Sequence, residues 1–183
     1  MSYNPFHNLE KPEILRYEYS WVNFVKYDKI VDDVMNPEIL ESWKRCKEKN
    51  LNYMMREFPP VFLGLDELSS KIEINFELLN IALPFMETLI EIINEPHINV
   101  QIIDKDGFLL KSLNNYNSIR DVDLLFSIGL NINEEYIGTN SAGLALINQK
   151  PIEVVGAEHY CQLMQNNACY AAPIFSSEGG IAA

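Results

Sequence analysis

The longest apolar repeat in the sequence lies between residues 66 and 93. Its apolar positions are separated alternately by four and three residues, which is the spacing of one face of a helix. These positions are Ile72, Phe76, Leu79, Leu83, Met86, Ile90 and Ile93. Pro84 lies inside the repeat and is expected to kink or split the helix, because proline lacks an amide hydrogen and clashes with the preceding turn. The pattern fits either a helix that covers a sheet or a seam between two copies of the chain.

A second helix is expected over residues 37–50. Asn36 can cap its first turn, and Pro37 fits the first helical position, where an amide hydrogen is not needed. The apolar face of this helix contains Ile39, Leu40, Trp43 and Cys46. We interpret Trp43 as a core or interface anchor. Residues 1–35 are rich in aromatic side chains but lack a clear period, and they fit a short strand, a helix or an extended arm.

Two β-rich runs, residues 98–103 and 108–113, flank the sequence Asp104-Lys105-Asp106-Gly107. Aspartate and glycine favour a tight turn, so these residues predict a β-hairpin. The turn also resembles part of a calcium-binding loop, but Ile102 and Leu113 stand where such a loop needs acidic ligands. A calcium site is therefore not expected.

The densest set of local signals lies near the end of the sequence. A helix of small residues is expected to begin at Thr139 or Asn140, because either side chain can accept hydrogen bonds from the amides of a first turn. Pro151 ends that helix, since the residue before a proline is pushed out of the helical region. Residues 152–155 fit one strand, and residues 168–175 fit another.

A polar corner follows the first of these strands. Glu158, His159 and Tyr160 place a carboxylate, an imidazole and a phenol side by side. They fit either a structural cap for a following helix or one wall of a ligand pocket, in which a few polar groups orient a small molecule. Small residues in the preceding helix and the following strand leave room for a pocket between that helix and the sheet. The candidate ligand-binding residues are Glu158, His159, Tyr160, Thr139, Asn140 and Cys169.

Catalytic and metal-ligating patterns are absent from the sequence. It contains no glycine-rich nucleotide-binding motif and no nucleophile elbow. Cys46, Cys161 and Cys169 form no Cys-x-x-Cys pair, which favours reduced thiols and a cytosolic protein. His159 with its neighbouring cysteines matches no common metal-site spacing, and no third residue completes a catalytic set. We therefore expect neither an enzyme nor a metal protein, and no cofactor can be named.

Composition and charge restrict the partners. The 183 residues are 48% hydrophobic and 22% charged, which is typical of a globular protein with a sizeable core. With 26 acidic and 14 basic residues, the net charge is −12. Such a surface repels phosphate backbones, so direct nucleic-acid binding is not expected. No apolar run is long enough to span a membrane, and no signal peptide opens the sequence, so a cytoplasmic location is predicted.

Several blocks of the sequence, taken in order, carry a family resemblance. They are SWKRC (42–46), ALPFME (82–87), DKDG (104–107), GTNSAGLAL (138–146), Pro151, GAEHY (156–160) and CYAAPI (169–174). From about residue 37 onward the chain resembles the N-terminal GAF sensor domain of sigma-54-dependent transcriptional activators of the acetoin-catabolism regulator type. Several blocks in the same order are far more specific than any one of them alone.

The resemblance, together with the predicted elements, implies an α+β, GAF-type fold with helices flanking an antiparallel sheet. It divides the chain into a helical N-terminal extension, residues 1–65, and a sensor domain, residues 66–183. Ile181 begins a strand that stops at once, so we expect a fragment whose next strand is central to the sheet.

The resemblance further implies a homodimer in which a small-molecule effector regulates downstream AAA+ and DNA-binding domains of the same full-length protein. The alternative is a dimerisation or protein-interaction module with no bound ligand. A small thiol or metal enzyme is the third and weakest hypothesis.

Overall fold

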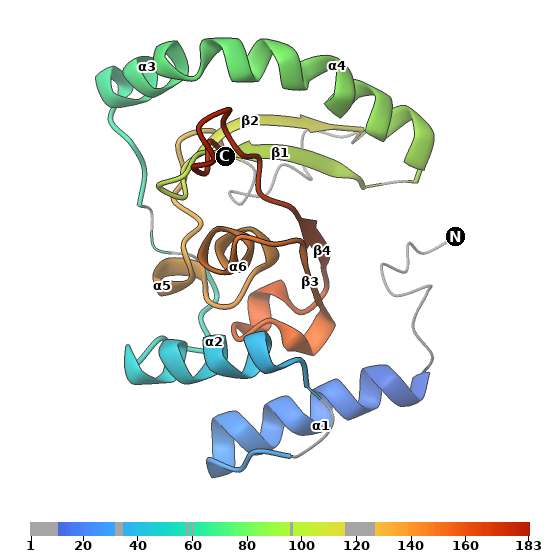
Figure 1. The fold of residues 1–183 in the computed structure, drawn as a ribbon. Coiled ribbons are helices and arrows are strands. Elements are labelled where there is room, and N and C mark those ends of the chain that lie inside the picture. Colours follow the sequence, from blue (N-terminus) through green and yellow to red (C-terminus); the bar gives the residue numbers. More distant parts are fainter. Residues whose placement is uncertain (1–10, 32–34, 58, 60, 96, 116–126) are drawn as a thin grey trace. The chain divides into compact units, whose positions relative to one another are not determined.

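The structure is a computed structural model of the chain and describes residues 11–31, 35–57, 59, 61–95, 97–115 and 127–183 (Figure 1). Packing groups most of the chain into two compact units, which we describe separately. The hairpin unit contains Pro60–Ile132, and the corner unit contains Ser2–Pro59 and Asn133–Ile181. This grouping differs from the expected division after residue 65, and that domain boundary stays a prediction.

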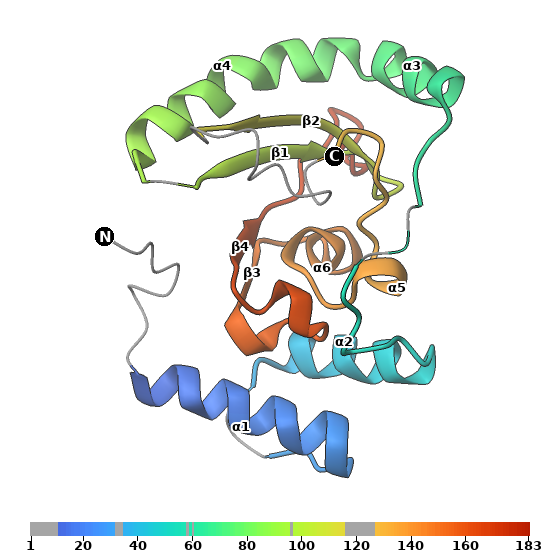
Figure 2. The same cartoon turned by 180° about the vertical axis from the view of Figure 1, so that it is seen from behind.

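The hairpin unit consists of two helices and a β-hairpin (Figure 2). The elements are α3 (Leu65–Ile74), α4 (Phe76–Ile93), β1 (Asn99–Ile103) and β2 (Leu109–Asn114). The strands are antiparallel, with a register irregularity between Ile102 and Ile103, and α4 packs on both of them. The hairpin predicted from the sequence is therefore confirmed.

Asp104 fixes the turn of the hairpin. Its buried carboxylate accepts hydrogen bonds from the amides of Asp106, at 3.0 Å, and Phe108, at 2.9 Å. The ammonium group of Lys71 lies 2.5 Å from the other Asp104 oxygen and 2.7 Å from Asp106. Gly107 completes the turn at φ +87°, a conformation that glycine adopts without a steric penalty. The carboxylates of this turn thus accept hydrogen bonds from backbone amides and pair with a lysine.

The apolar repeat forms two helices that meet at Asn75. At this junction the side-chain amide and the backbone amide of Asn75 both donate to the carbonyl of Lys71, at 2.8 and 3.1 Å. The helix does not split at Pro84, so that part of the prediction was wrong, and a kink there stays a prediction. Pro84 instead lies within α4. Ala82 and Met86, on either side of it, are buried, and their packing keeps the helix continuous across one missing backbone bond.

Much of the predicted seam lies against the hairpin. Met86 is buried, and Leu79, Leu83 and Ile90 are half-buried in the helix that covers β1 and β2. This supports the interpretation of the repeat as a helix covering a sheet. Pairing of two copies through the same residues stays a prediction.

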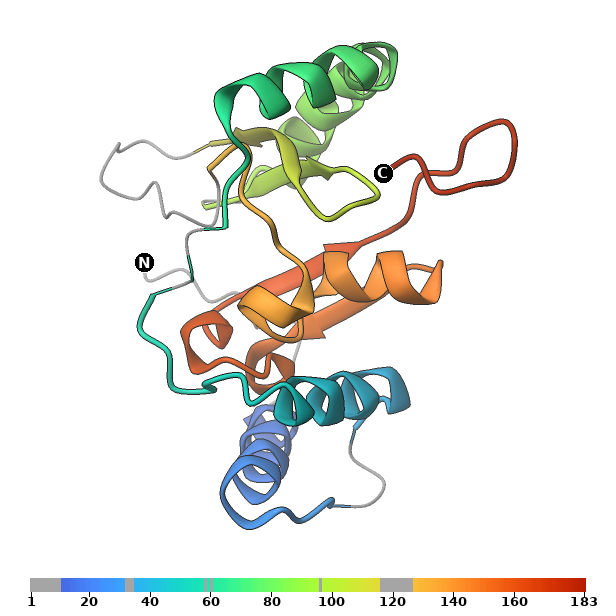
Figure 3. The ribbon, with the colours of Figure 1, turned by 90° about the vertical axis from the view of Figure 1, so that its left-hand side faces the viewer.

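The corner unit combines four α-helices and a second antiparallel strand pair (Figure 3). Its elements are α1 (Lys11–Tyr27), α2 (Pro37–Glu48), α5 (Glu134–Ile137), α6 (Ser141–Asn148), β3 (Ile152–Val155) and β4 (Ala168–Ala171). Helix α6 packs on both strands. As predicted, Asn36 caps α2 by accepting from Glu38, and Asn140 caps α6 by accepting from Gly143 at 2.8 Å.

Part of the N-terminal segment, which fitted a strand, a helix or an extended arm, forms a helix that packs in the core of the corner unit. Within the described part of that segment, residues 11–27 form a helix that contributes Trp21 and Phe24 to the core. Both pack with Trp43, Leu144 and residues of the corner, and the Phe24 and Trp43 rings lie 5.3 Å apart. Trp43 is thus a core residue, as predicted, and α1 belongs to the same core.

A buried polar network joins α2 to α5 and to the loop before α6. Arg45 donates two hydrogen bonds to the carboxylate of Glu134, and the Ser42 hydroxyl donates to the same carboxylate at 2.7 Å. The Ser42 and Thr139 hydroxyl oxygens are 2.8 Å apart. Because Ser42 has one proton and gives it to Glu134, Thr139 donates to Ser42. The network explains why polar side chains are buried between these helices.

No helix in the described ranges combines the length and apolar character needed to cross a membrane. The elements observed are mixed helices and strands with small antiparallel sheets, consistent with the α+β expectation. One interpretation of the polar corner required a helix directly after it, but two short 3₁₀ turns, Gly156–Glu158 and Gln162–Met164, lie there instead.

The loop before α6 yields a stability prediction. Gly138 has φ +78°, and a Cβ there would lie 2.7 Å from Sγ of Cys161. Gly138→Ala should therefore destabilise the protein by about 2–4 kcal/mol, the sum of backbone strain and overlap. In a Cys161→Ala background the same change should cost less, because the overlapping sulfur is gone. Urea unfolding of all four proteins measures this coupling, and equal costs in both backgrounds would show that the sulfur is not the obstacle.

Candidate functional site

The polar corner is held by two tryptophans. The indole NH of Trp43, from α2, donates to the carbonyl of Glu158 at 2.7 Å. The indole NH of Trp21, from α1, donates to the carbonyl of Tyr160 at 2.8 Å. Between them, the side-chain amide of Gln165 donates to the carbonyl of His159 at 3.1 Å. Three successive buried carbonyls are thus satisfied by side chains, which lets an irregular segment lie in the core.

His159 is completely buried, with 0% of its surface exposed. Its Nδ1 lies 3.0 Å from the carbonyl of Gly156, and its Nε2 has no hydrogen-bond partner among the residues that the structure describes. Burial lowers the pKa of His159 to about 4, so the ring is neutral near pH 7. A neutral ring that donates from Nδ1 to Gly156 carries a free lone pair on Nε2.

Glu158 is buried next to His159, and its pKa is shifted in the opposite direction. Its carboxyl group accepts a hydrogen bond from the amide of Val155 at 2.9 Å. Burial, together with the nearby charge of Glu153, raises the pKa of Glu158 to about 7, although the Val155 amide opposes the shift. The carboxyl group is therefore partly protonated at neutral pH.

Tyr160 completes the predicted trio, which the structure brings together in one buried segment. Its ring lies edge-to-face with that of Tyr53, with centroids 6.4 Å apart. Burial raises the pKa of the Tyr160 phenol to about 12, so it stays protonated. The trio thus presents neutral or weakly ionised groups at neutral pH.

The other three predicted site residues have structural partners. Thr139 bonds with Ser42, and Asn140 caps α6 while its amide donates to the carbonyl of Gly138 at 2.9 Å. Cys169 lies on β4 opposite Val154, so its side chain faces the same side of the strand pair. Burial raises the pKa of the Cys169 thiol to about 12. The ligand-binding role of these residues stays a prediction.

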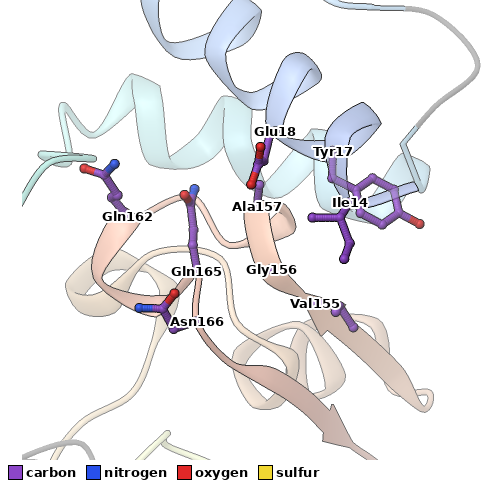
Figure 4. Close-up of a pocket in the computed structure, with 9 residues that line it drawn as sticks. All are labelled: Ile14, Tyr17, Glu18, Val155, Gly156, Ala157, Gln162, Gln165 and Asn166. Carbon is purple, nitrogen blue, oxygen red and sulfur yellow. The ribbon is translucent and has the colours of Figure 1, made fainter. Parts of the chain in front are cut away.

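A cavity of about 290 Å³ lies beside the corner, between α1 and the segment from β3 to the second 3₁₀ turn (Figure 4). It is lined by Ile14, Tyr17 and Glu18 of α1 and by Val155, Gly156, Ala157, Gln162, Gln165 and Asn166. Its volume is close to the lower limit of small-molecule sites. Its lining combines the apolar residues Ile14, Val155 and Ala157 with carboxamide, phenol and carboxylate groups.

The α1 side of this cavity was missed by sequence reasoning, which placed a pocket between α6 and the sheet. Tyr17, Trp21 and Phe24 are four and three residues apart, so they share one helical face. That spacing was the available signal. It was obscured by Tyr19 and Tyr27, which are aromatic but exposed.

The chemistry of the corner favours binding over catalysis. Burial raises the pKa of Cys161 to about 12 and that of Cys46 to about 11, so neither sulfur is a ready thiolate nucleophile. All three cysteines are free, and the described residues contain no cluster of three or more potential metal ligands. The corner thus contains a neutral imidazole and a protonated phenol, and the neighbouring cavity is lined by carboxamides.

Comparison with known proteins identifies related sequences. A family profile described as "MimR, N-terminal domain" matches residues 20–178. The chain is 32% identical over 165 residues to the acetoin dehydrogenase operon transcriptional activator AcoR of Bacillus subtilis. It is 26% identical over 154 residues to the propane 2-monooxygenase operon transcriptional activator MimR of Mycolicibacterium goodii. These alignments cover 89% and 82% of this chain but only 27% and 25% of the relatives.

A solved structure shares the fold. DhaR(N), in the crystal structure of the E. coli DhaR(N)–DhaL complex, superposes with a TM-score of 0.73 at 23% sequence identity. The match covers 80% of this chain and 50% of that chain. The sequence resemblance to acetoin-catabolism-type activators is thus confirmed, and the chain spans about a quarter of the length of AcoR and MimR.

The shifted carboxyl group predicts an unusual pH dependence. In the folded protein Glu158 keeps its proton up to about pH 7, whereas the ordinary pKa is 4.5. The folded state therefore binds more protons between these values, and wild-type stability falls as pH rises through this window. The Glu158→Gln variant does not lose stability in this way, and its side-chain oxygen can still accept a hydrogen bond from the Val155 amide. Its stability relative to wild type should rise by up to about 3 kcal/mol from pH 4.5 to 7.

Denaturant unfolding of both proteins across this pH range measures the difference. His159, whose pKa is lowered, changes the stability with pH in the opposite direction. This contribution is present in both proteins, so it cancels in the difference between their stabilities. Glu178→Gln makes the same change of charge on an exposed turn and serves as the control. A Glu158→Gln difference that does not vary with pH would show that this carboxyl group is ionised in the folded protein throughout.

Proposed function

Because the chain belongs to the MimR N-terminal domain family, we propose that it is the small-molecule-sensing domain of a bacterial sigma-54-dependent transcriptional activator. In this proposal the fold is of the GAF type, and the domain regulates AAA+ and DNA-binding domains that belong to the same full-length protein. The domain performs no catalysis and acts in the cytoplasm. It does not contact nucleic acid itself, which agrees with a net charge of −12.

The unpaired Nε2 of His159 carries the sensing proposal. Buried polar atoms without a protein partner are rare in native proteins, and a bound ligand or an ordered water commonly satisfies them. A fully buried acceptor is well suited to select a molecule that supplies a hydrogen-bond donor. The neighbouring cavity, which His159 does not line, adds space for a small molecule beside Gly156 and Ala157.

The names of the relatives point to small oxygenated carbon compounds. AcoR controls an acetoin dehydrogenase operon, and MimR controls a propane 2-monooxygenase operon. Acetoin carries a hydroxyl group, and so does propan-2-ol, which results from inserting oxygen at the second carbon of propane. A hydroxyl group can donate to the lone pair of Nε2, whereas a simple ketone cannot. We therefore propose small alcohols and hydroxyketones as the effector class.

A protein-interaction module without a ligand is the second candidate. The observation that favours it is the assembly of the structural neighbour DhaR(N) with the protein DhaL.

Homodimerisation through the apolar repeat of α4 is compatible with both candidates. Sedimentation of the 183-residue chain at micromolar concentration tests it, and a monomer would exclude it.

Two substitutions at His159 separate ligand binding from folding. Asparagine keeps a donor near the position of Nδ1, which can bond Gly156, and removes Nε2. Glutamine keeps a polar group near Nε2 and removes Nδ1. We expect acetoin and propan-2-ol to raise the Tm of the wild type more than diacetyl and acetone do, because only the first pair can donate.

His159→Asn should lose this preference, with about tenfold weaker binding, because one hydrogen bond of about 1 kcal/mol is gone. Its ligand-free stability should exceed that of His159→Gln, in which the carbonyl of Gly156 keeps only the hydrogen bond from the backbone amide of residue 159. Thermal-shift titration and calorimetry measure both quantities. Equal stabilisation by alcohols and ketones, or full ligand response in His159→Asn, would remove His159 from the site, and no response to any small oxygenated compound would favour the interaction module.

A further inference from the structure

Helix α4 carries a second apolar face, which we call the α4 stripe and define as Ile81, Phe85, Leu89 and Ile92. The spacings of four, four and three residues place these side chains on one side of the helix. Their exposed fractions are 58%, 67%, 46% and 73%. Ala82 and Met86, each one residue after a member of the stripe, lie about 100° further round the helix and are buried. The stripe therefore adjoins the surface that packs on the hairpin and remains exposed beside it.

Scattered exposed apolar residues are ordinary, but four large ones in a row along a helix are not. The helix would lose little of its own packing if these positions were polar, because each side chain is largely outside the core. An apolar row of this kind, with its neighbours three and four residues apart, matches the surface to which an amphipathic partner helix binds.

The charges around the stripe specify the partner. Helix α4 contains Glu77, Glu87 and Glu91 and no lysine or arginine. Along the sequence, the nearest basic side chains are Lys71 and Lys105. Lys71 is already paired with Asp104 and Asp106. At about 100° per residue, Glu77 and Glu91 lie along one edge of the stripe, whereas Glu87 lies on the far side of the helix. One edge of the stripe is thus acidic, and α4 supplies no cation to compensate it.

We propose that the α4 stripe is a docking site for a cationic amphipathic helix of a partner protein. Leucine-like side chains of that helix would cover Ile81, Phe85 and Ile92, and its lysine or arginine residues would face the acidic edge. A second copy of this chain fits less well, because two acidic edges would then be brought together. An anionic membrane surface is disfavoured for the same reason.

The test uses the 183-residue chain and fluorescent peptides of equal length. One peptide carries leucine at helical spacing with lysine on its polar face, the second has glutamate in place of lysine, and the third is a scrambled form of the first. Fluorescence anisotropy should show binding of the first peptide at least tenfold tighter than binding of the other two. Added salt should weaken it, since the charge contribution is screened.

Matched variants locate the site. Phe85→Ser should weaken binding of the lysine peptide at least fivefold, whereas Ile147→Ser, at an exposed apolar residue of α6, should leave it unchanged. Glu77→Gln with Glu91→Gln should weaken it more than Glu48→Gln with Glu178→Gln, which removes the same charge elsewhere on the exposed surface. Circular dichroism checks that each variant is folded.

Three results would overturn the proposal. Equal affinity for the helical and scrambled lysine peptides would show unspecific attraction to an acidic protein. Unchanged binding to the Phe85→Ser variant would place the site elsewhere. A dimer in sedimentation experiments that Phe85→Ser disperses would show that a second copy covers the stripe.

Discussion

Two indole-to-carbonyl hydrogen bonds hold the corner unit together. Trp21 and Trp43 reach the carbonyls of Tyr160 and Glu158 from different helices, at 2.8 and 2.7 Å. An irregular segment can be buried only if its backbone groups are paired, and these bonds pair them without a strand neighbour. The aromatic rings also supply much of the core around Leu144 and Val154. The same two side chains therefore give the unit its apolar packing and make its polar corner tolerable.

The network around Glu134 likewise pairs buried polar groups with hydrogen bonds, in this case side chains between α2, α5 and the loop before α6. Its buried carboxylate is matched by Arg45 and Ser42, and Thr139 completes the set. Two of the sequence blocks that carry the family resemblance, residues 42–46 and 138–146, meet in this network. The polar residues of these two blocks are thus explained by their burial against each other and by the hydrogen bonds between them. A polar residue in a recognisable motif need not touch a ligand.

The sequence predicted the local elements well and the three-dimensional site less well. The caps at Asn36 and Asn140 and the turn at residues 104–107 depend on neighbouring residues, so short-range patterns found them. The break at Asn75 did not follow from spacing, because the apolar repeat continues through it from Ile72 to Phe76. The cavity joins α1 to residues about 140 positions later, and no local pattern encodes that meeting.

The opposite pKa shifts of Glu158 and His159 have one cause and one consequence. Burial disfavours the charged form of each group, which raises the pKa of the acid and lowers that of the base. The corner can therefore be buried with little net charge, and an ion would meet few compensating charges there. The cavity beside it is bounded by α1 on one side and by the corner on the other, and Trp21 joins these two elements directly. Any molecule bound in that cavity contacts both elements at once, so its binding energy also stabilises the packing of α1 on the corner.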